Sequence, residues 1–121
     1  MKDHRKLEIW SEAMSYCESI YPFANELPAT ERYNLADQMR RAVVSIPLNI
    51  AEGAGCDSET DFRRFLWYAY RSAHEVATCL ELARRLQVTR VRHEEFDRLL
   101  DLADKLAAMI YRFIHRLNVD H

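Results

Sequence analysis

The sequence predicts an all-α protein, an antiparallel four-helix bundle of up-down-up-down order. Apolar residues recur at spacings of three and four along four successive segments, a pattern typical of helices that bury one face in a bundle. The 121 residues include only two glycines and three prolines, which leaves little material for the turns of a sheet. Short connections between long helices make neighbours antiparallel. A chain of this length is expected to form one domain, 1–121, with its own core.

The first helix is expected over residues 7–24, and Pro28 follows its end because proline cannot continue a helix. Thr30 is expected to cap the second helix through its hydroxyl group. The stripe expected to face the core comprises Leu7, Trp10, Met14, Cys17, Tyr21 and Ala24.

The second helix contains the stretch "SIPLNIAEG" at residues 45–53, which places a proline and an asparagine in an apolar run. Pro47 has no N–H group, so the carbonyl of Val43 loses its helical partner and the helix is expected to bend at Pro47. Ser45 is expected to donate back to the carbonyl of Arg41. The core stripe of this helix is predicted to comprise Leu35, Met39, Ala42, Ile46 and Asn49.

Asn49 extends that apolar stripe, so its amide should point inward, where it needs hydrogen-bond partners. In a hairpin of the second and third helices, the nearest open groups are the N–H groups around Asp61 and Phe62, or the loop before them. Asn49 is therefore predicted to clasp the corner between these helices, and Glu52 and Gly53 to serve the same corner. The alternative is a ligand-binding amide at a junction between subunits.

The third helix is expected to begin after Ser58, a suitable N-cap, and to fade near residues 87–89. Its core stripe is predicted to comprise Phe62, Phe65, Leu66, Ala69, Ala73, Val76, Leu80 and Ala83. The fourth helix is expected to bury Phe96, Leu99, Ala103, Leu106, Ile110, Phe113 and Leu117.

The third helix carries more aromatic surface than one stripe can bury. The rings that point to nearly all sides of it are Phe62, Phe65, Trp67, Tyr68 and Tyr70. Because an exposed apolar patch usually marks an interface, self-association is expected. The alternative is that these side chains lie along the surface with their polar atoms in solvent.

The stretches "LPATERYNLADQMRRAVVSIPLNIAEG" and "SETDFRRFLWYAYRSAHEV" resemble the bacterial four-helix bundle proteins, also called 23S rRNA intervening sequence proteins. The accessory variability determinant of diversity-generating retroelements is a relative of this family. The resemblance spans the chain in length and helix order. The matching residues of the first stretch are Pro28, Glu31, Tyr33, Leu35, Gln38, Arg40, Arg41, Ser45, Ile46, Pro47 and Asn49 to Gly53. Those of the second are Ser58, Phe62, Phe65, Ala69, Ser72 and Glu75.

The resemblance implies a closed bundle that assembles into a homopentamer. For the retroelement relative it also implies binding to nucleic acid and to a reverse transcriptase. The chain departs from the family in two respects. Arg71 stands where the family usually has glycine, so either the helices separate there or the arginine points outward. The net charge is −2, whereas the retroelement relative is strongly basic.

Five arginines form the candidate nucleic-acid surface, and they are Arg40, Arg41, Arg63, Arg64 and Arg71. Repeated around an oligomer, such a surface would neutralise phosphates. The alternative is pairing within the chain, with Arg41 opposite Glu75 and Arg63 opposite Glu52.

Other chemistry is not indicated by the sequence. The three cysteines show no CxxC spacing, so free thiols in a reducing compartment are expected, including Cys56 before the third helix. The histidines lack the Glu-x-x-His spacing of metal sites in bundles, and no glycine-rich phosphate loop occurs. Neither a signal peptide nor a membrane span is indicated. We therefore expect no metal, no cofactor and a cytoplasmic location.

Two functions remain open. The first is a non-catalytic oligomeric scaffold or adaptor that binds RNA, DNA or a nucleic-acid-processing partner. The second is a small bundle enzyme or ligand-binding protein with a site at the subunit interface. Because no catalytic constellation is present in the sequence, the first is preferred and the protein is predicted not to be an enzyme.

Overall fold

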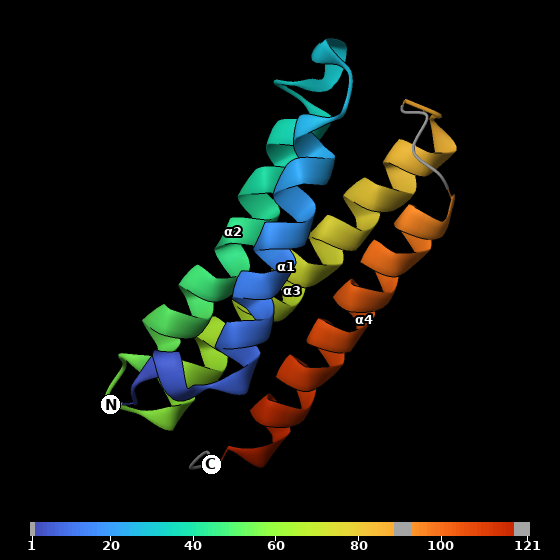
Figure 1. Ribbon diagram of the computed structural model, residues 1–121. Helices are drawn as coiled ribbons and strands as arrows, with labels where there is room; N and C mark the ends of the chain where they lie inside the picture. The colour runs from blue at the N-terminus through green and yellow to red at the C-terminus, as the bar shows by residue number, and fades with distance from the viewer. Residues whose placement is uncertain (1, 89–92, 118–121) are drawn as a thin grey trace.

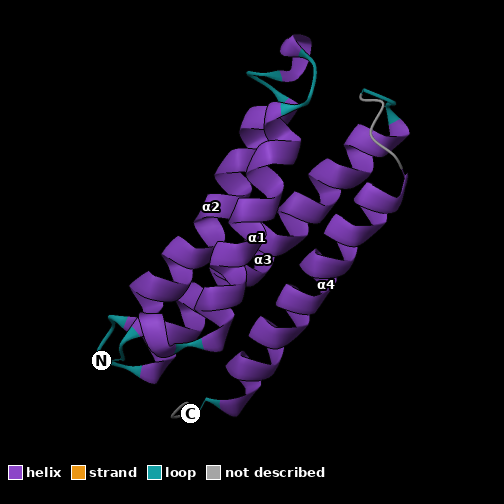
Figure 2. Ribbon diagram, in the orientation of Figure 1, coloured by secondary structure: helices purple, strands orange, loops and turns teal. Residues whose placement is uncertain are grey.

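The computed structural model describes residues 2–88 and 93–117, and the regular structure in these ranges is helical (Figure 2). The helices are α1 (Glu8–Asn25), α2 (Leu35–Ala54), α3 (Glu59–Arg85) and α4 (His93–Arg116). Two short 3-10 turns, η1 (His4–Lys6) and η2 (Ala29–Glu31), precede α1 and α2.

The four helices form a closed bundle in chain order. α1 packs on α2 and α4, and α3 packs on the same two helices. The start of α1, the α2–α3 connection and the end of α4 lie at one end of the bundle, so neighbouring helices run antiparallel (Figure 1). The predicted fold class is confirmed.

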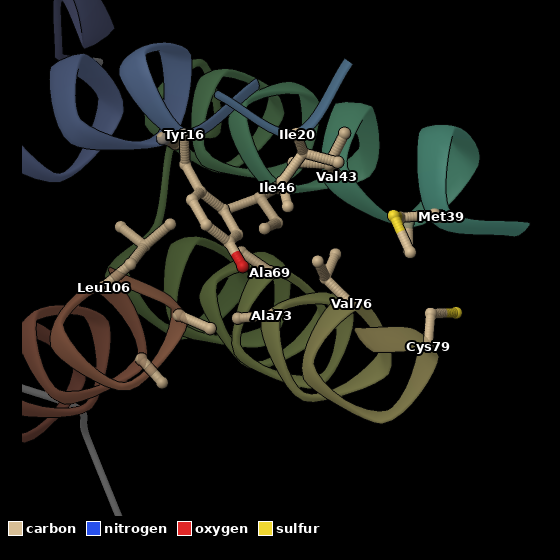
Figure 3. Packing of buried hydrophobic residues seen from close by; sticks show 14 of the residues in the cluster. Tyr16, Ile20, Met39, Val43, Ile46, Ala69, Ala73, Val76, Cys79 and Leu106 are labelled. Atoms are coloured by element: carbon tan, nitrogen blue, oxygen red, sulfur yellow. The ribbon is translucent and has the colours of Figure 1, made fainter. Parts of the chain in front are cut away.

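The core lies along the axis of the bundle and draws on all four helices (Figure 3). Small residues on α3, such as Ala69 and Ala73, leave room for larger side chains from its neighbours. The largest fully buried side chains are Ile20, Met39, Val43, Ile46, Ile50, Leu66, Val76, Leu80, Leu99, Leu106, Ile110 and Ile114.

The predicted core stripe of α1 is wrong by one residue. Met14 and Tyr21 are 39% and 38% exposed, whereas the buried stripe comprises Ile9, Ala13, Tyr16, Ile20, Phe23 and Ala24. Tyr16 explains the difference, because its hydroxyl donates a hydrogen bond of 3.0 Å to the carbonyl of Leu99 on α4. A buried tyrosine that finds such an acceptor is well accommodated. Burial raises the pKa of Tyr16 well above its usual range, so the hydroxyl stays protonated.

α2 continues through Pro47 to Ala54, so the proline does not end the helix. The bend at Pro47 stays a prediction. The carbonyl of Val43, which Pro47 leaves without its helical donor, accepts a hydrogen bond of 3.3 Å from the Cys17 thiol of α1. Burial raises the pKa of Cys17 to about 11, which keeps the thiol protonated and able to donate. The missing backbone donor is thus replaced by a side chain of the neighbouring helix.

The helix ends agree with the sequence at α3 but not at α2. The Ser58 hydroxyl accepts from the N–H of Asp61 at 3.1 Å, which confirms the predicted N-cap. α3 ends at Arg85, and Gln87 follows with a φ of 53°, close to the predicted stop; Thr89 lies outside the described residues. Thr30 does not cap α2, because it lies within η2 and Asn34 is the residue before the helix.

Candidate nucleic-acid interface

Three of the five predicted arginines lie together on the outer face of α3. They line an open hollow of about 630 Å³, whose walls come from α3 alone. We call it the arginine hollow, and its residues are Thr60, Arg63, Arg64, Trp67, Tyr68, Tyr70 and Arg71. The recurrence at three and four residues places most of them on one outward stripe. The hollow therefore combines cations and aromatic rings.

The cations of the arginine hollow are weakly neutralised within the chain. Arg64 is 3.5 Å from Asp61, and both side chains are more than half exposed, so the pair contributes little. The guanidinium of Arg71 lies 5.1 Å from the ring centre of Tyr68. Among the residues that the structure describes, none forms an ion pair with Arg63. Arg71 is exposed, so it points outward rather than separating the helices.

Arg40 and Arg41 lie elsewhere on the bundle. Arg40 donates to the Asn25 side chain and to the carbonyl of Arg32, both at 3.1 Å, near the α1–α2 connection. The hydroxyls of Ser45 and Ser72 are bonded to each other and fix the register of α2 on α3. Counted from this pair at about 1.5 Å per residue, Arg40 and Arg64 lie about 20 Å apart along the bundle. Arg71 lies between them, about 9 Å along the bundle from Arg40 by the same count. Arg40 and Arg41 are therefore separated from Arg63 and Arg64, and the predicted set of five does not form one cluster.

The predicted ion pairs between α2 and α3 are wrong. Arg41 pairs instead with Asp37, one turn earlier on its own helix, at 3.2 Å. A partner at this spacing is reached without holding an extended side chain across a helix interface. Glu52 and Glu75 are both exposed, and neither forms an ion pair with a described residue.

The predicted partners of Asn49 are also wrong. Its amide donates to the carbonyl of Ser45 at 2.8 Å and to the Ser45 hydroxyl at 3.2 Å, within α2 rather than across the corner. Ser45 in turn bonds to Ser72 of α3 and not back to Arg41. The half-buried amide is therefore satisfied one turn away. It supports a polar contact in the middle of the α2–α3 interface.

Gly53 allows close packing at the corner because it has no side chain. A Cβ atom at this position would lie 2.8 Å from Cδ1 of Phe62 and 2.9 Å from Cβ of Phe65. Ser45, Asn49 and Gly53 recur every four residues, so they form one seam along α2. This seam of small and polar residues lets α2 and α3 approach closely at the corner. Packing thus explains Ser45, Asn49 and Gly53 of the motif "SIPLNIAEG".

Comparison with known proteins identifies the family. Residues 5–112 match the family model described as 23S rRNA-intervening sequence protein. The chain belongs to this family. The match includes the α2–α3 seam and the whole arginine hollow. In this family member α2 and α3 pack closely together, and the arginines lie on the outer face of α3.

One solved structure supports the fold of this intervening sequence protein. It is the crystal structure of a protein with unknown function from the S23 ribosomal protein family of Bacteroides thetaiotaomicron VPI-5482. Its TM-score is 0.78 at 21% sequence identity, and the match covers 88% of this chain and 97% of that chain. No curated protein is a significant match.

The aromatic surplus of α3 is smaller in this family member than its sequence indicated. Phe62 is buried against Phe113, with ring centres 5.6 Å apart, and Trp67 is half-buried. Tyr68 remains 36% exposed. α4 adds Tyr111, 46% exposed, beside Trp67 at 6.0 Å. The aromatic surface therefore spans α3 and α4, and the contribution of α4 was missed because sequence periodicity does not show which helix faces align.

Other chemistry has little support in the described part of this intervening sequence protein. No three histidine, cysteine, aspartate or glutamate side chains come together there as a metal site. The three cysteines form no disulfide with one another in the structure. No described helix has the length and apolar character needed to span a bilayer.

Proposed function

We propose that the protein is a non-catalytic, cytoplasmic oligomeric adaptor that binds nucleic acid through the arginine hollow. The supporting observation is the hollow itself, where Arg63, Arg64 and Arg71 share one outward face with aromatic rings. Arginines without strong carboxylate partners are available to neutralise phosphates.

The charge distribution reconciles this proposal with an overall charge of −2. A second hollow, on α3 and α4, is lined by His74, Ala77, Thr78, Glu81, Asp97, Leu100, Asp101 and Asp104. Arg84 pairs with Glu81 and Asp97, but no described cation pairs with Asp101 or Asp104. Negative charge is thus concentrated away from the arginine hollow, and a phosphate backbone would be confined to the basic half of α3.

Charge removal at two places tests the nucleic-acid function. We expect Arg63→Gln with Arg64→Gln to weaken binding of an RNA fragment at low salt. The slope of log affinity against log salt should become shallower by about two, because two phosphate contacts are lost. The measurement is a filter-binding titration at several salt concentrations.

Arg40→Gln with Arg41→Gln is the matched control, because it removes the same charge about 20 Å away. This variant should bind nearly as the natural protein does. Equal losses in both variants would mean that only net charge matters and would reject the hollow as the site. No binding by the natural protein would reject the nucleic-acid function.

The oligomeric part of the proposal is a homopentamer, the state that the family resemblance implies. We expect light scattering coupled to size exclusion, at micromolar concentration, to give five times the chain mass. A monomer mass would contradict multivalent binding.

A further inference from the structure

We propose that the arginine hollow takes single-stranded nucleic acid, with an unpaired base stacked on Trp67 and the flanking phosphates held by Arg63 and Arg64. This inference rests on the proposed nucleic-acid function. It adds that the nucleic acid is single-stranded and that Trp67 distinguishes a single strand from a duplex.

The hollow has the composition of a stacking site. Trp67, Tyr68 and Tyr70 line it together with its three arginines. Every base has an aromatic face, so stacking on such rings binds single strands without selecting a sequence. In a duplex these faces are covered by neighbouring base pairs, and only the phosphates would reach the protein. A surface for duplex alone would need the arginines but not the rings.

Trp67 is held in a fixed orientation. Its ring packs edge-to-face with Tyr70 at 5.3 Å, with Tyr111 at 6.0 Å and with His115 at 6.1 Å. Their interplanar angles are 88°, 81° and 84°, in that order. Three perpendicular neighbours from α3 and α4 limit the motion of the indole, which remains half-exposed. A platform ordered before binding loses less entropy when a base stacks on it.

The arginines beside Trp67 are also positioned by rings. The guanidinium of Arg71 lies over Tyr68, and that of Arg64 lies over Phe65, each 5.1 Å from the ring centre. An arginine that lies on an aromatic face keeps the N–H groups of its guanidinium plane available for a phosphate. The cations and Trp67 therefore occupy positions where they can act on one short segment of backbone and base.

The second hollow, on α3 and α4, limits how far the strand extends. Asp101 and Asp104 line the α3–α4 surface beyond His74, and they would repel phosphates there. The strand is thus restricted to the basic half of α3, which fits a short site of the size that single-strand binding modules use.

Fluorescence of Trp67 tests the stacking contact directly. The chain has two tryptophans, so Trp10→Phe leaves Trp67 as the only one. We expect an oligothymidylate of about 12 nucleotides to bind this protein and to quench its emission. A sugar–phosphate strand of the same length without bases should bind more weakly and leave the emission unchanged. A duplex of the same length should also bind without quenching.

Two substitutions test whether Trp67 acts through its aromatic face or only as a bulky apolar side chain. Trp67→Leu should raise the dissociation constant for oligothymidylate about tenfold, while its effect on duplex binding stays small. Trp67→Phe keeps an aromatic face and should retain most of the affinity. Light scattering should show the same oligomer mass for all variants. The Trp10→Phe measurement keeps the natural Trp67, so it decides the question even if Trp67→Leu fails to fold.

The outcomes distinguish this inference from the function on which it rests. If the strand with bases, the strand without bases and the duplex bind equally and without quenching, the stacking site is rejected while phosphate binding stands. If none of the three binds, both proposals fail. If Trp67→Leu instead dissociates the oligomer, the aromatic face is an interface between copies of the chain and the stacking site is rejected.

Discussion

We expect Gly53→Val to lower the free energy of unfolding by about 3 kcal/mol, because the new side chain overfills the α2–α3 corner. Cβ alone would come within 2.9 Å of Phe65 Cβ, an atom that moves only if α3 moves. The ring of Phe62 is 2% exposed and packs on Phe113, so it has little room to turn away. Gly53→Ala should lose less than the valine variant, since it adds only the first of the crowded atoms. Urea unfolding at one fixed protein concentration measures both.

Gly55 provides the matched control two residues later. A Cβ atom there would meet only ordinary contacts, the nearest being the carbonyl of Glu52 at 3.5 Å. Its φ is −81°, which any residue adopts. Gly55→Ala should therefore change stability by no more than about 0.5 kcal/mol. Similar losses at both glycines would show that backbone flexibility, and not close packing of the helices, requires glycine at this corner.

The fold was predictable because its signals are periodic and local. Most of the core residues of α3 and α4 and the N-cap at Ser58 follow directly from the spacing of residues along the chain. Phe65, Phe113 and Leu117 were predicted to lie in the core but are only partly buried. Cys79, Ala107 and Ile114 are buried and were missed. The stripe of α1 was misplaced because two neighbouring registers have similar apolar spacing. The true one places the hydroxyl of Tyr16 in the core, and its acceptor on α4 is not visible in the sequence of α1.

The candidate site was predictable only in part. The sequence indicated an arginine surface, but the prediction grouped Arg40 with Arg64, which the register fixed by the Ser45–Ser72 pair places about 20 Å apart along the bundle. The pairing of Arg41 was wrong because a partner one turn away, Asp37, competes with any partner across the interface. Side-chain partners of this kind depend on rotamers and local distances, which periodicity does not report.

The hydrogen bond that replaces the missing N–H of Pro47 was likewise not predictable from the sequence alone. Because Pro47 has no N–H group, the carbonyl of Val43 loses its helical partner and needs a donor from elsewhere in the protein. The donor is Cys17, which the sequence indicated only as a free thiol on the first helix. The alignment of α1 with α2 decides that the two meet. This contact links Pro47 of α2 to Cys17 of α1, so the change in the free energy of unfolding on replacing one should depend on the other.

We therefore expect Cys17→Val to cost about 1–3 kcal/mol when Pro47 is present and much less in a Pro47→Ala background. Valine keeps an apolar side chain but donates nothing, so the partly buried carbonyl of Val43 loses its partner. Alanine at position 47 restores a backbone N–H, which can donate to that carbonyl within α2. The difference between the two costs, from a double-mutant cycle in urea, measures the coupling. Cys79→Val is the control, because Cys79 is buried but forms no hydrogen bond with a described residue, and its cost should be the same in both backgrounds. If Cys17→Val costs the same with proline as with alanine at position 47, the thiol contributes by packing alone and the Val43 carbonyl does not depend on it.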